Sequence, residues 1–150
     1  MNILLHFLLN YFVIDATLGN ASNYIAYIAF FSIILDLDHI PYVLKVKKNL
    51  VYRKFGSESR SRFHELYGIT ICSLAISASY LFLDLALTKV IALSLILHYA
   101  ADFLLGKTRP FYPFSKKEVF LGICPEKFRV PVEIALTSIL AVIFWLTMIS

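Results

Sequence analysis

The sequence predicts an all-α fold: a polytopic transmembrane bundle of about five apolar helices that forms a single integral membrane domain over residues 1–150. Composition is the first observation, since 59% of the residues are hydrophobic, only 16% are charged, and the mean hydropathy is +0.75. A typical soluble domain is roughly 45–50% apolar and about 25% charged. The second observation is that the apolar residues form long runs, and the third is that the basic residues gather between those runs.

The apolar runs are the expected helices, and they cover residues 2–18, 21–35, 66–87, 90–105 and 131–149. A full crossing takes about 20 residues, within a range of roughly 17–25. The third and fifth runs satisfy this length. The other three are short, so we expect them to cross with flanking residues included or to pack partly buried against neighbours.

The connections between these helices carry their own signals. We expect the third and fourth helices to be joined by a turn between Asp84 and Lys89, and Gly106 to cap the fourth helix. The residue before a proline disfavours helix, so the second helix should end at Ile40, before Pro41. Pro131 suits the first turn of the last helix, where Glu133 would face the positive end of the helix dipole.

Basic residues are confined to two clusters. Of the 14 lysines and arginines, seven lie between Lys45 and Arg62, six lie between Lys107 and Arg129, and Lys89 alone lies elsewhere. Basic loops of membrane proteins stay in the cytoplasm. The N-terminus and both basic loops are therefore predicted to be cytoplasmic, in a multi-pass protein of the cell membrane. A nucleic-acid partner is not expected, because apolar runs flank both clusters and topology explains them.

The potential metal ligands gather at one end of this topology. All four histidines and three of the aspartates fall toward the predicted cytoplasmic side. They are His6, Asp36, Asp38, His39, His64, His98 and Asp102. The two cysteines, Cys72 and Cys124, do not form a disulfide framework, and neither a glycine-rich phosphate loop nor a GxSxG elbow is present.

His98 and Asp102 form the strongest pair. They are four residues apart in an apolar helix and therefore share one face. An ionised group at the centre of a membrane helix costs roughly 2.5–3.5 kcal/mol on insertion scales, so such groups usually serve a function. Metal binding or catalysis is the favoured interpretation. A His–Asp hydrogen bond that locks the helix is the alternative.

The segment from Asp36 to His39 places three potential ligands in four positions. On a helix Asp36 and His39 share a face, and Asp38 points elsewhere unless the chain breaks before Pro41. Carboxylate and imidazole groups together suit zinc, iron or manganese. A solvated loop entry would explain Asp38 alone, but not all three residues.

Two further pairs repeat the spacing of four residues. Arg60 could share a helical face with His64, and an arginine beside a metal suits a phosphate or a carboxylate. Anchoring of Arg60 and Arg62 to inner-leaflet lipids is the alternative. His6 and Asn10 are also four apart; alone, His6 would be interpreted as a packed polar residue, but it belongs to the same group of ligands.

These motifs, in this order, resemble those of the YdjM-like family of membrane-bound metal-dependent hydrolases, over roughly residues 6 to 114. The family pattern has an early histidine, then PDxDH, HRGxTHS, HxxxD and a turn ending near Tyr-Pro-Phe. The matching residues are His6; Asp36, Asp38 and His39; Arg60 and His64; His98 and Asp102; and Tyr112, Pro113 and Phe114. The chain departs from the pattern at Leu35, Ser59, Ser61 and Glu65.

The resemblance implies a reaction class. The family is distantly similar to zinc-dependent phospholipase C and related zinc nucleases, which hold zinc ions on helical histidines and aspartates and hydrolyse phosphoesters. By this resemblance the chain would be a metal-dependent hydrolase that acts on a lipid-linked phosphoester at the cytoplasmic face. The cofactor would be one or more divalent ions, with zinc favoured and iron or manganese as alternatives.

Each candidate residue has an expected role. The expected metal ligands are His6, Asp38, His39, His64, His98 and Asp102. Asp36 and Glu65 are candidate general bases, and Arg60 is a candidate catalytic residue. An anionic phospholipid or other phosphoester substrate would be held by Arg60, Arg62, Lys107 and Arg109. Two other functions are considered: a non-enzymatic metal-binding membrane scaffold, and an ion or proton pathway, which the one-sided placement of the ionisable groups disfavours.

Overall fold

The computed structural model describes residues 2–40, 44, 65–106, 108–112, 114–115, 117–121 and 123–149. The helices within these residues are α1 (Ile3–Leu18), α2 (Ile25–Ile33), α5 (Leu66–Phe82), α6 (Leu85–Leu105) and α7 (Glu126–Ile149). Two 3-10 segments, η1 (Ala21–Tyr24) and η2 (Ile34–His39), flank α2. The described residues contain one isolated antiparallel bridge, between Thr108 and Val119, and no strand. The predicted all-α fold is confirmed.

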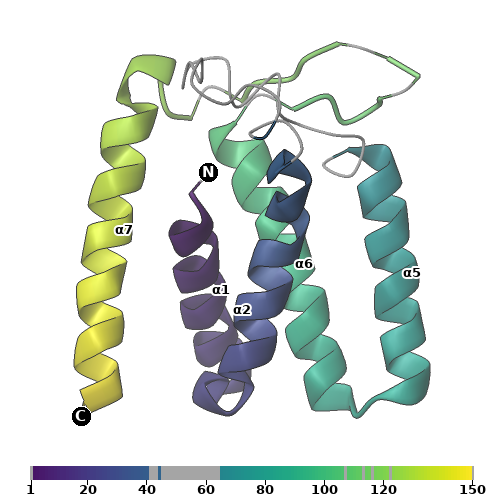
Figure 1. Cartoon of the computed structure of the whole chain (residues 1–150), viewed down its shortest axis with the longest axis vertical. Coiled ribbons are helices and arrows are strands. Elements are labelled where there is room, and N and C mark those ends of the chain that lie inside the picture. The colour runs from purple at the N-terminus through teal and green to yellow at the C-terminus, as the bar shows by residue number, and fades with distance from the viewer. Residues whose placement is uncertain are drawn as a thin grey trace.

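Helices α1, α2 and α6 pack against one another and form the centre of the bundle. Helix α7 packs on α1, and α5 packs on α6 (Figure 1). The starts of α1, α5 and α7 and the ends of η2 and α6 all lie at one end of the bundle, at the top of Figure 1. Both basic clusters follow helices that end there, so the predicted alternation of the helices is confirmed. Their placement on the cytoplasmic side stays a prediction.

The first hairpin follows the sequence closely. Asn2 caps α1, because its side chain accepts a hydrogen bond from the Leu5 amide at 2.7 Å. Gly19 and Asn20 then adopt positive φ angles of 69° and 51°, which reverse the chain. The side chain of Asp15 accepts a hydrogen bond from the Ala21 amide at 3.0 Å and so closes the turn. The apolar run predicted over residues 21–35 is divided among η1, α2 and η2, and the helical path continues through η2 to His39, next to the end predicted at Ile40.

The predicted boundary between the third and fourth helices was wrong. Helix α5 ends at Phe82 and α6 begins at Leu85, so Lys89 lies inside α6 and the turn is centred on Leu83 and Asp84. The side chain of Asp84 accepts a hydrogen bond from the Leu87 amide at 2.8 Å. This N-cap satisfies an amide that the helix itself cannot, and it fixes where α6 starts. Consequently α5 has 17 residues and α6 has 21.

The start of the last helix was also misplaced. Helix α7 begins at Glu126, so Pro131 lies inside the helix and Glu133 lies beyond its first turn. The carbonyl of Pro125 accepts a hydrogen bond from the Phe128 amide at 2.8 Å and closes the opening turn. The predicted cap at Gly106 is confirmed, since its amide donates to the Asp102 carbonyl at 2.9 Å.

Two of the described helices are long and apolar enough to cross a membrane, over Leu85–Leu105 and Lys127–Ile149. In the second helix only 6% of the most apolar 18-residue stretch is buried inside the protein. Large apolar side chains such as Ile139 and Trp145 are exposed there. An apolar surface of this extent is typical of contact with lipid or with another protein. Between the three central helices, toward the end at which α6 starts, lies a buried apolar cluster formed by Tyr11, Ile14, Ala21, Ile28 and Val90. Polar side chains are buried at the opposite end of the same helices.

Candidate metal centre

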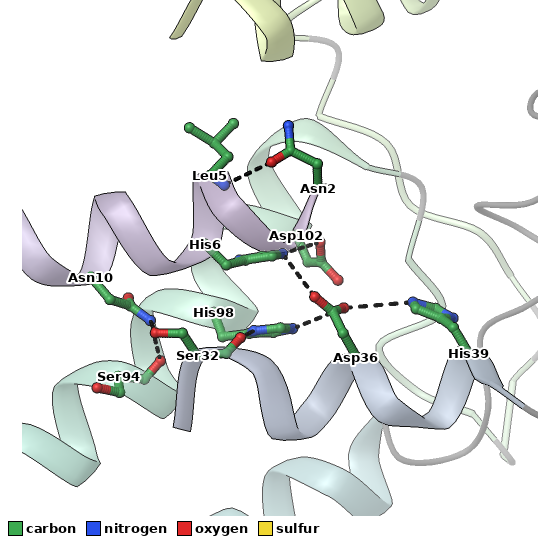
Figure 2. Close-up of polar contacts among 10 residues, drawn as sticks. All are labelled: Asn2, Leu5, His6, Asn10, Ser32, Asp36, His39, Ser94, His98 and Asp102. Atoms are coloured by element: carbon green, nitrogen blue, oxygen red, sulfur yellow. Dashed lines mark hydrogen bonds and ion pairs between the residues drawn. The ribbon is translucent and has the colours of Figure 1, made fainter. Parts of the chain in front are cut away.

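Four ionisable side chains meet inside the end of the bundle at which η2 and α6 end (Figure 2). His6 comes from the first turns of α1, Asp36 from η2, and His98 and Asp102 from the last turns of α6. All four are buried, with relative exposures of 1% for His6, 6% for Asp36, 0% for His98 and 5% for Asp102. Buried ionisable groups of this kind are paired or bind metals, because burying an isolated charge is costly.

Asp36 lies at the centre of this group. One carboxylate oxygen, Oδ1, is 3.6 Å from His98 Nε2 and 3.7 Å from His39 Nε2. The other, Oδ2, is 4.0 Å from His6 Nε2, and His6 Nε2 is also 3.4 Å from Asp102 Oδ1. One ligand atom each from His6, His98 and Asp102 lie within 4.8 Å of one another, so these residues could hold a metal ion.

The protonation of His98 is set by its other ring nitrogen. Nδ1 of His98 lies 2.9 Å from the carbonyl oxygen of Ser32. A carbonyl only accepts hydrogen bonds, so Nδ1 carries the proton. In a neutral imidazole Nε2 then holds a lone pair, and that lone pair faces the carboxylate of Asp36. Two acceptors face each other at this point, an arrangement that a cation between them or a proton on Nε2 would relieve.

His6 gives a second indication that the group could hold a cation. Among the described residues, neither ring nitrogen of His6 makes a hydrogen bond, although the side chain is buried. Most buried polar side-chain atoms in proteins have a hydrogen-bond partner. With two carboxylates and three imidazoles drawn together, the residues present fit a divalent transition metal, because they supply the nitrogen and oxygen ligands that zinc takes.

A layer of small polar residues supports the cluster one helical turn deeper. Asn10 follows His6 by four residues, Ser32 precedes Asp36 by four, and Ser94 precedes His98 by four. Nδ2 of Asn10 donates to Ser32 Oγ at 2.6 Å and to the Ser94 carbonyl at 3.2 Å. Ser32 Oγ in turn donates to the Ile28 carbonyl at 2.6 Å. These bonds join the three central helices directly beneath the histidines.

This layer has the form of the support found behind metal ligands. A metal-ligating histidine almost always donates its second ring N–H to a carbonyl, a carboxylate or water, which fixes its tautomer and orientation. The Ser32 carbonyl does this for His98. Sequence reasoning noted Asn10 but missed Ser32 and Ser94. The available signal was a polar residue four positions from a candidate ligand on each of three apolar helices.

Five of the predicted site residues are brought together here: His6, Asp36, His39, His98 and Asp102. His39 lies at the edge of the group, with 19% of its side chain exposed. Asp38 lies in η2, but its side chain is outside the described residues, as are Arg60, Arg62, His64 and Lys107.

The remaining predicted residues, Glu65 and Arg109, form an ion pair with each other. Nε of Arg109 lies 3.5 Å from Oε1 of Glu65, whose side chain is buried. Glu65 immediately precedes α5, and Arg109 follows α6, so the pair joins two segments at the end of the bundle where the cluster lies. Their roles as general base and anion-binding group stay predictions.

Fold and site together describe an all-helical protein in which two helices are apolar enough to cross a membrane and a buried group of histidines and aspartates could hold a metal ion. The chain belongs to the YdjM inner membrane protein family, whose family model matches residues 1–149. This confirms the YdjM family that the sequence motifs indicate, whereas the metal-dependent hydrolase activity and the similarity to zinc-dependent phospholipase C stay predictions. No curated protein and no solved structure matches the chain.

Proposed function

We propose that this protein is a metal-dependent hydrolase of the inner membrane that acts on a lipid-linked phosphoester at the cytoplasmic face. The observation that supports this most directly is the opposition of the His98 Nε2 lone pair and the Asp36 carboxylate at 3.6 Å, beside His6 and Asp102. A divalent cation bound between these groups would relieve that opposition. Zinc suits the mixed imidazole and carboxylate set best, with iron and manganese as alternatives.

The cluster itself would hold the metal. His6, His98, Asp36 and Asp102 are the residues that would bind it, with His39 at the more exposed edge. A bound divalent ion supplies Lewis acidity toward a phosphoryl oxygen and an activated water at neutral pH. Because Asp36 contacts three histidines, we assign it to binding the cation rather than to free general-base catalysis. Glu65 then remains the predicted general base.

The substrate class follows from the location of the cluster. It lies where η2 and α6 end, and a basic segment follows each of them in the sequence. An arginine binds a phosphate through paired hydrogen bonds. Arg109 would approach the substrate from the segment after α6, and Arg60, Arg62 and Lys107 are further predicted contacts. Because the group lies near helix ends rather than at the middle of the helices, a phosphoester at the lipid headgroup level is the favoured substrate.

The first test is metal content. The detergent-purified protein would be analysed by elemental mass spectrometry, as wild type and as the double variant His98→Ala/Asp102→Ala, with Glu118→Gln as a control that removes an exposed carboxylate. We expect zinc, iron or manganese in the wild type and the control, and its loss in the double variant. Circular dichroism would verify that the helices persist.

The second test is hydrolysis. The metal-loaded protein would be assayed on a chromogenic phosphodiester and on phospholipid in mixed micelles. Metal-dependent turnover that the double variant lacks would support the proposal. Bound metal without turnover of any phosphoester would favour the metal-binding scaffold instead, and a wild type that binds no metal even after reconstitution would overturn both.

A further inference from the structure

We propose that the cluster holds two divalent cations side by side, bridged by the carboxylate of Asp36. This rests on the proposed function only in that the cluster binds metal. One cation position is formed by His6, Asp102 and Oδ2 of Asp36, and the other by His98, His39 and Oδ1 of Asp36. The substrate that such a pair would take is an anionic phosphoester.

The first argument is the orientation of two imidazole rings. The rings of His6 and His98 are stacked, with centroids 3.9 Å apart and planes inclined by only 8°. Figure 2 shows both rings directed the same way, toward Asp36. The lone pair of an imidazole nitrogen lies in the plane of its ring. In parallel rings directed the same way, the two lone pairs therefore run side by side and do not converge on one point.

A single shared ion is consequently disfavoured. An ion midway between two nearly parallel rings whose centroids are 3.9 Å apart would lie up to ~2 Å out of each ring plane, a displacement comparable to the whole Zn–N bond of about 2.0–2.1 Å. It would sit over the rings rather than along their lone pairs. Two ions, each in the plane of one ring, would lie about as far apart as the rings do. Two-metal hydrolytic sites have a separation of about 3.5–4 Å.

The second argument is the division of contacts between the two oxygens of Asp36. Oδ1 faces His98 at 3.6 Å and His39 at 3.7 Å, whereas Oδ2 faces His6 at 4.0 Å. His6 also faces Asp102 at 3.4 Å. Ligand atoms bound tetrahedrally to one zinc ion with bonds of about 2.0–2.1 Å are ~3.3 Å apart. The donors thus fall into two groups at nearly ligand-to-ligand spacing, with one oxygen of Asp36 in each.

The third argument concerns charge and open positions. Two divalent cations against the two carboxylates Asp36 and Asp102 leave a net positive centre, which favours an anionic substrate. The described residues supply three protein donors to each position, and catalytic zinc sites typically combine three protein ligands with a water or a substrate. A phosphoester can then contact both ions, so that the attacking and the leaving oxygens are each stabilised.

Metal stoichiometry tests the pair. The purified protein would be stripped with chelator, reloaded with Zn²⁺ or Mn²⁺, freed of excess metal and analysed for ions per chain. We expect two ions per chain in the wild type and in the control Glu118→Gln. His39→Ala should retain one ion, because it removes a donor from one position only, and His39→Gln serves as the second variant if His39→Ala does not fold. Asp36→Asn should lose the pairing, because it removes the bridge.

A spectroscopic measurement reports the bridge itself. In the Mn²⁺-loaded wild type, electron paramagnetic resonance should show a spin-coupled pair, and in His39→Ala the signal of an isolated ion. One uncoupled ion in the wild type, unaffected by His39→Ala, would overturn the pair and leave the proposed hydrolase standing. No bound ion in the folded wild type would overturn the proposed function as well, so the two failures are distinguishable.

Discussion

The ring of His98 is held by the backbone of Ser32: Nδ1 donates to the Ser32 carbonyl at 2.9 Å, and this bond turns Nε2 toward Asp36. The contact joins α6 to the end of α2, and it is the backbone of Ser32, not its side chain, that fixes the tautomer. The Ser32 hydroxyl has a separate task, since it accepts from Asn10. The two parts of one residue can therefore be tested apart.

Ser32→Ala should preserve metal binding. The substitution keeps the carbonyl that orients His98 and removes only the hydroxyl that accepts from Asn10 at 2.6 Å. Asn10 retains its bond to the Ser94 carbonyl. We expect a loss of stability of about 1 kcal/mol, as for a typical hydrogen bond, and unchanged metal stoichiometry. Thermal unfolding in detergent and elemental analysis would measure the two effects, and a loss of metal would show that the hydroxyl, not the carbonyl, supports the site.

Asn10→Ala should be more damaging. It removes both bonds that join α1 to α2 and α6 beneath the histidines, and it leaves buried acceptors to find new partners. Unsatisfied buried polar groups cost roughly 1–3 kcal/mol each, and loss of outer support typically lowers metal affinity by about 10–100-fold. Competition with a zinc chelator would measure the affinity. The matched control is Asn23→Ala, the same substitution at an exposed position, for which neither quantity should change.

The composition of the site could be predicted because it depends on spacing. His98 and Asp102 share a face of one helix, and the alternating topology places His6 and Asp36 at the same end, so the four residues could be grouped without coordinates. The stacking of His6 on His98 could not be predicted, because it depends on how α1 and α6 pack. Ser32 was missed because a serine in an apolar helix usually bonds only to its own helix, as Ser73 and Ser77 do in α5. Ser94 was missed because it takes part through its backbone carbonyl, which the residue type does not reveal.

The boundaries that failed have a common cause. Asp84 interrupts a continuous apolar stretch, and the hydrophobic pattern alone extended the third helix past it to residue 87. The capping bond from the Leu87 amide decided the boundary instead. The last helix was predicted to start at Pro131 because proline favours the first turn of a helix. Pro125 followed by Glu126 is an equally good start signal, and the helix begins there, five residues earlier. The spacing of apolar residues does not reveal the local hydrogen bonds that set where a helix begins and ends.

Asp84→Ala should separate stability from function. Loss of an N-cap costs about 0.5–2 kcal/mol, and Asp84 caps the end of α6 that lies farthest along the helix from Asp102. We expect a lower unfolding temperature with unchanged metal content, and Asp84→Asn should restore most of the stability because asparagine also caps. A variant that lost metal along with the cap would indicate that the cluster depends on the whole length of α6.

The exposed apolar face of α7 predicts a depth-dependent response to charge. Ile139 is 57% exposed and lies well inside the helix, whereas Ile149 is 65% exposed and is its last residue. A lysine at the centre of a membrane helix costs roughly 2.5–3.5 kcal/mol on insertion scales, whereas near an end it reaches the interface. Ile139→Lys should therefore reduce the membrane-inserted fraction, measured by carbonate extraction, and Ile149→Lys should not. Equal behaviour of the two variants would contradict a membrane-spanning α7.

Cysteine labelling can determine which side of the membrane the cluster faces. In a background with Cys72→Ser and Cys124→Ser, single cysteines would be introduced by Thr17→Cys, near the tip of the first hairpin, and by Glu118→Cys, in the segment between α6 and α7. A membrane-impermeant thiol reagent added to intact cells should label Thr17→Cys and spare Glu118→Cys, because the basic clusters are retained in the cytoplasm. Both cysteines should react after the cells are opened. The reverse pattern would place the histidines and aspartates on the outer face of the membrane, where they could not act on a cytoplasmic substrate.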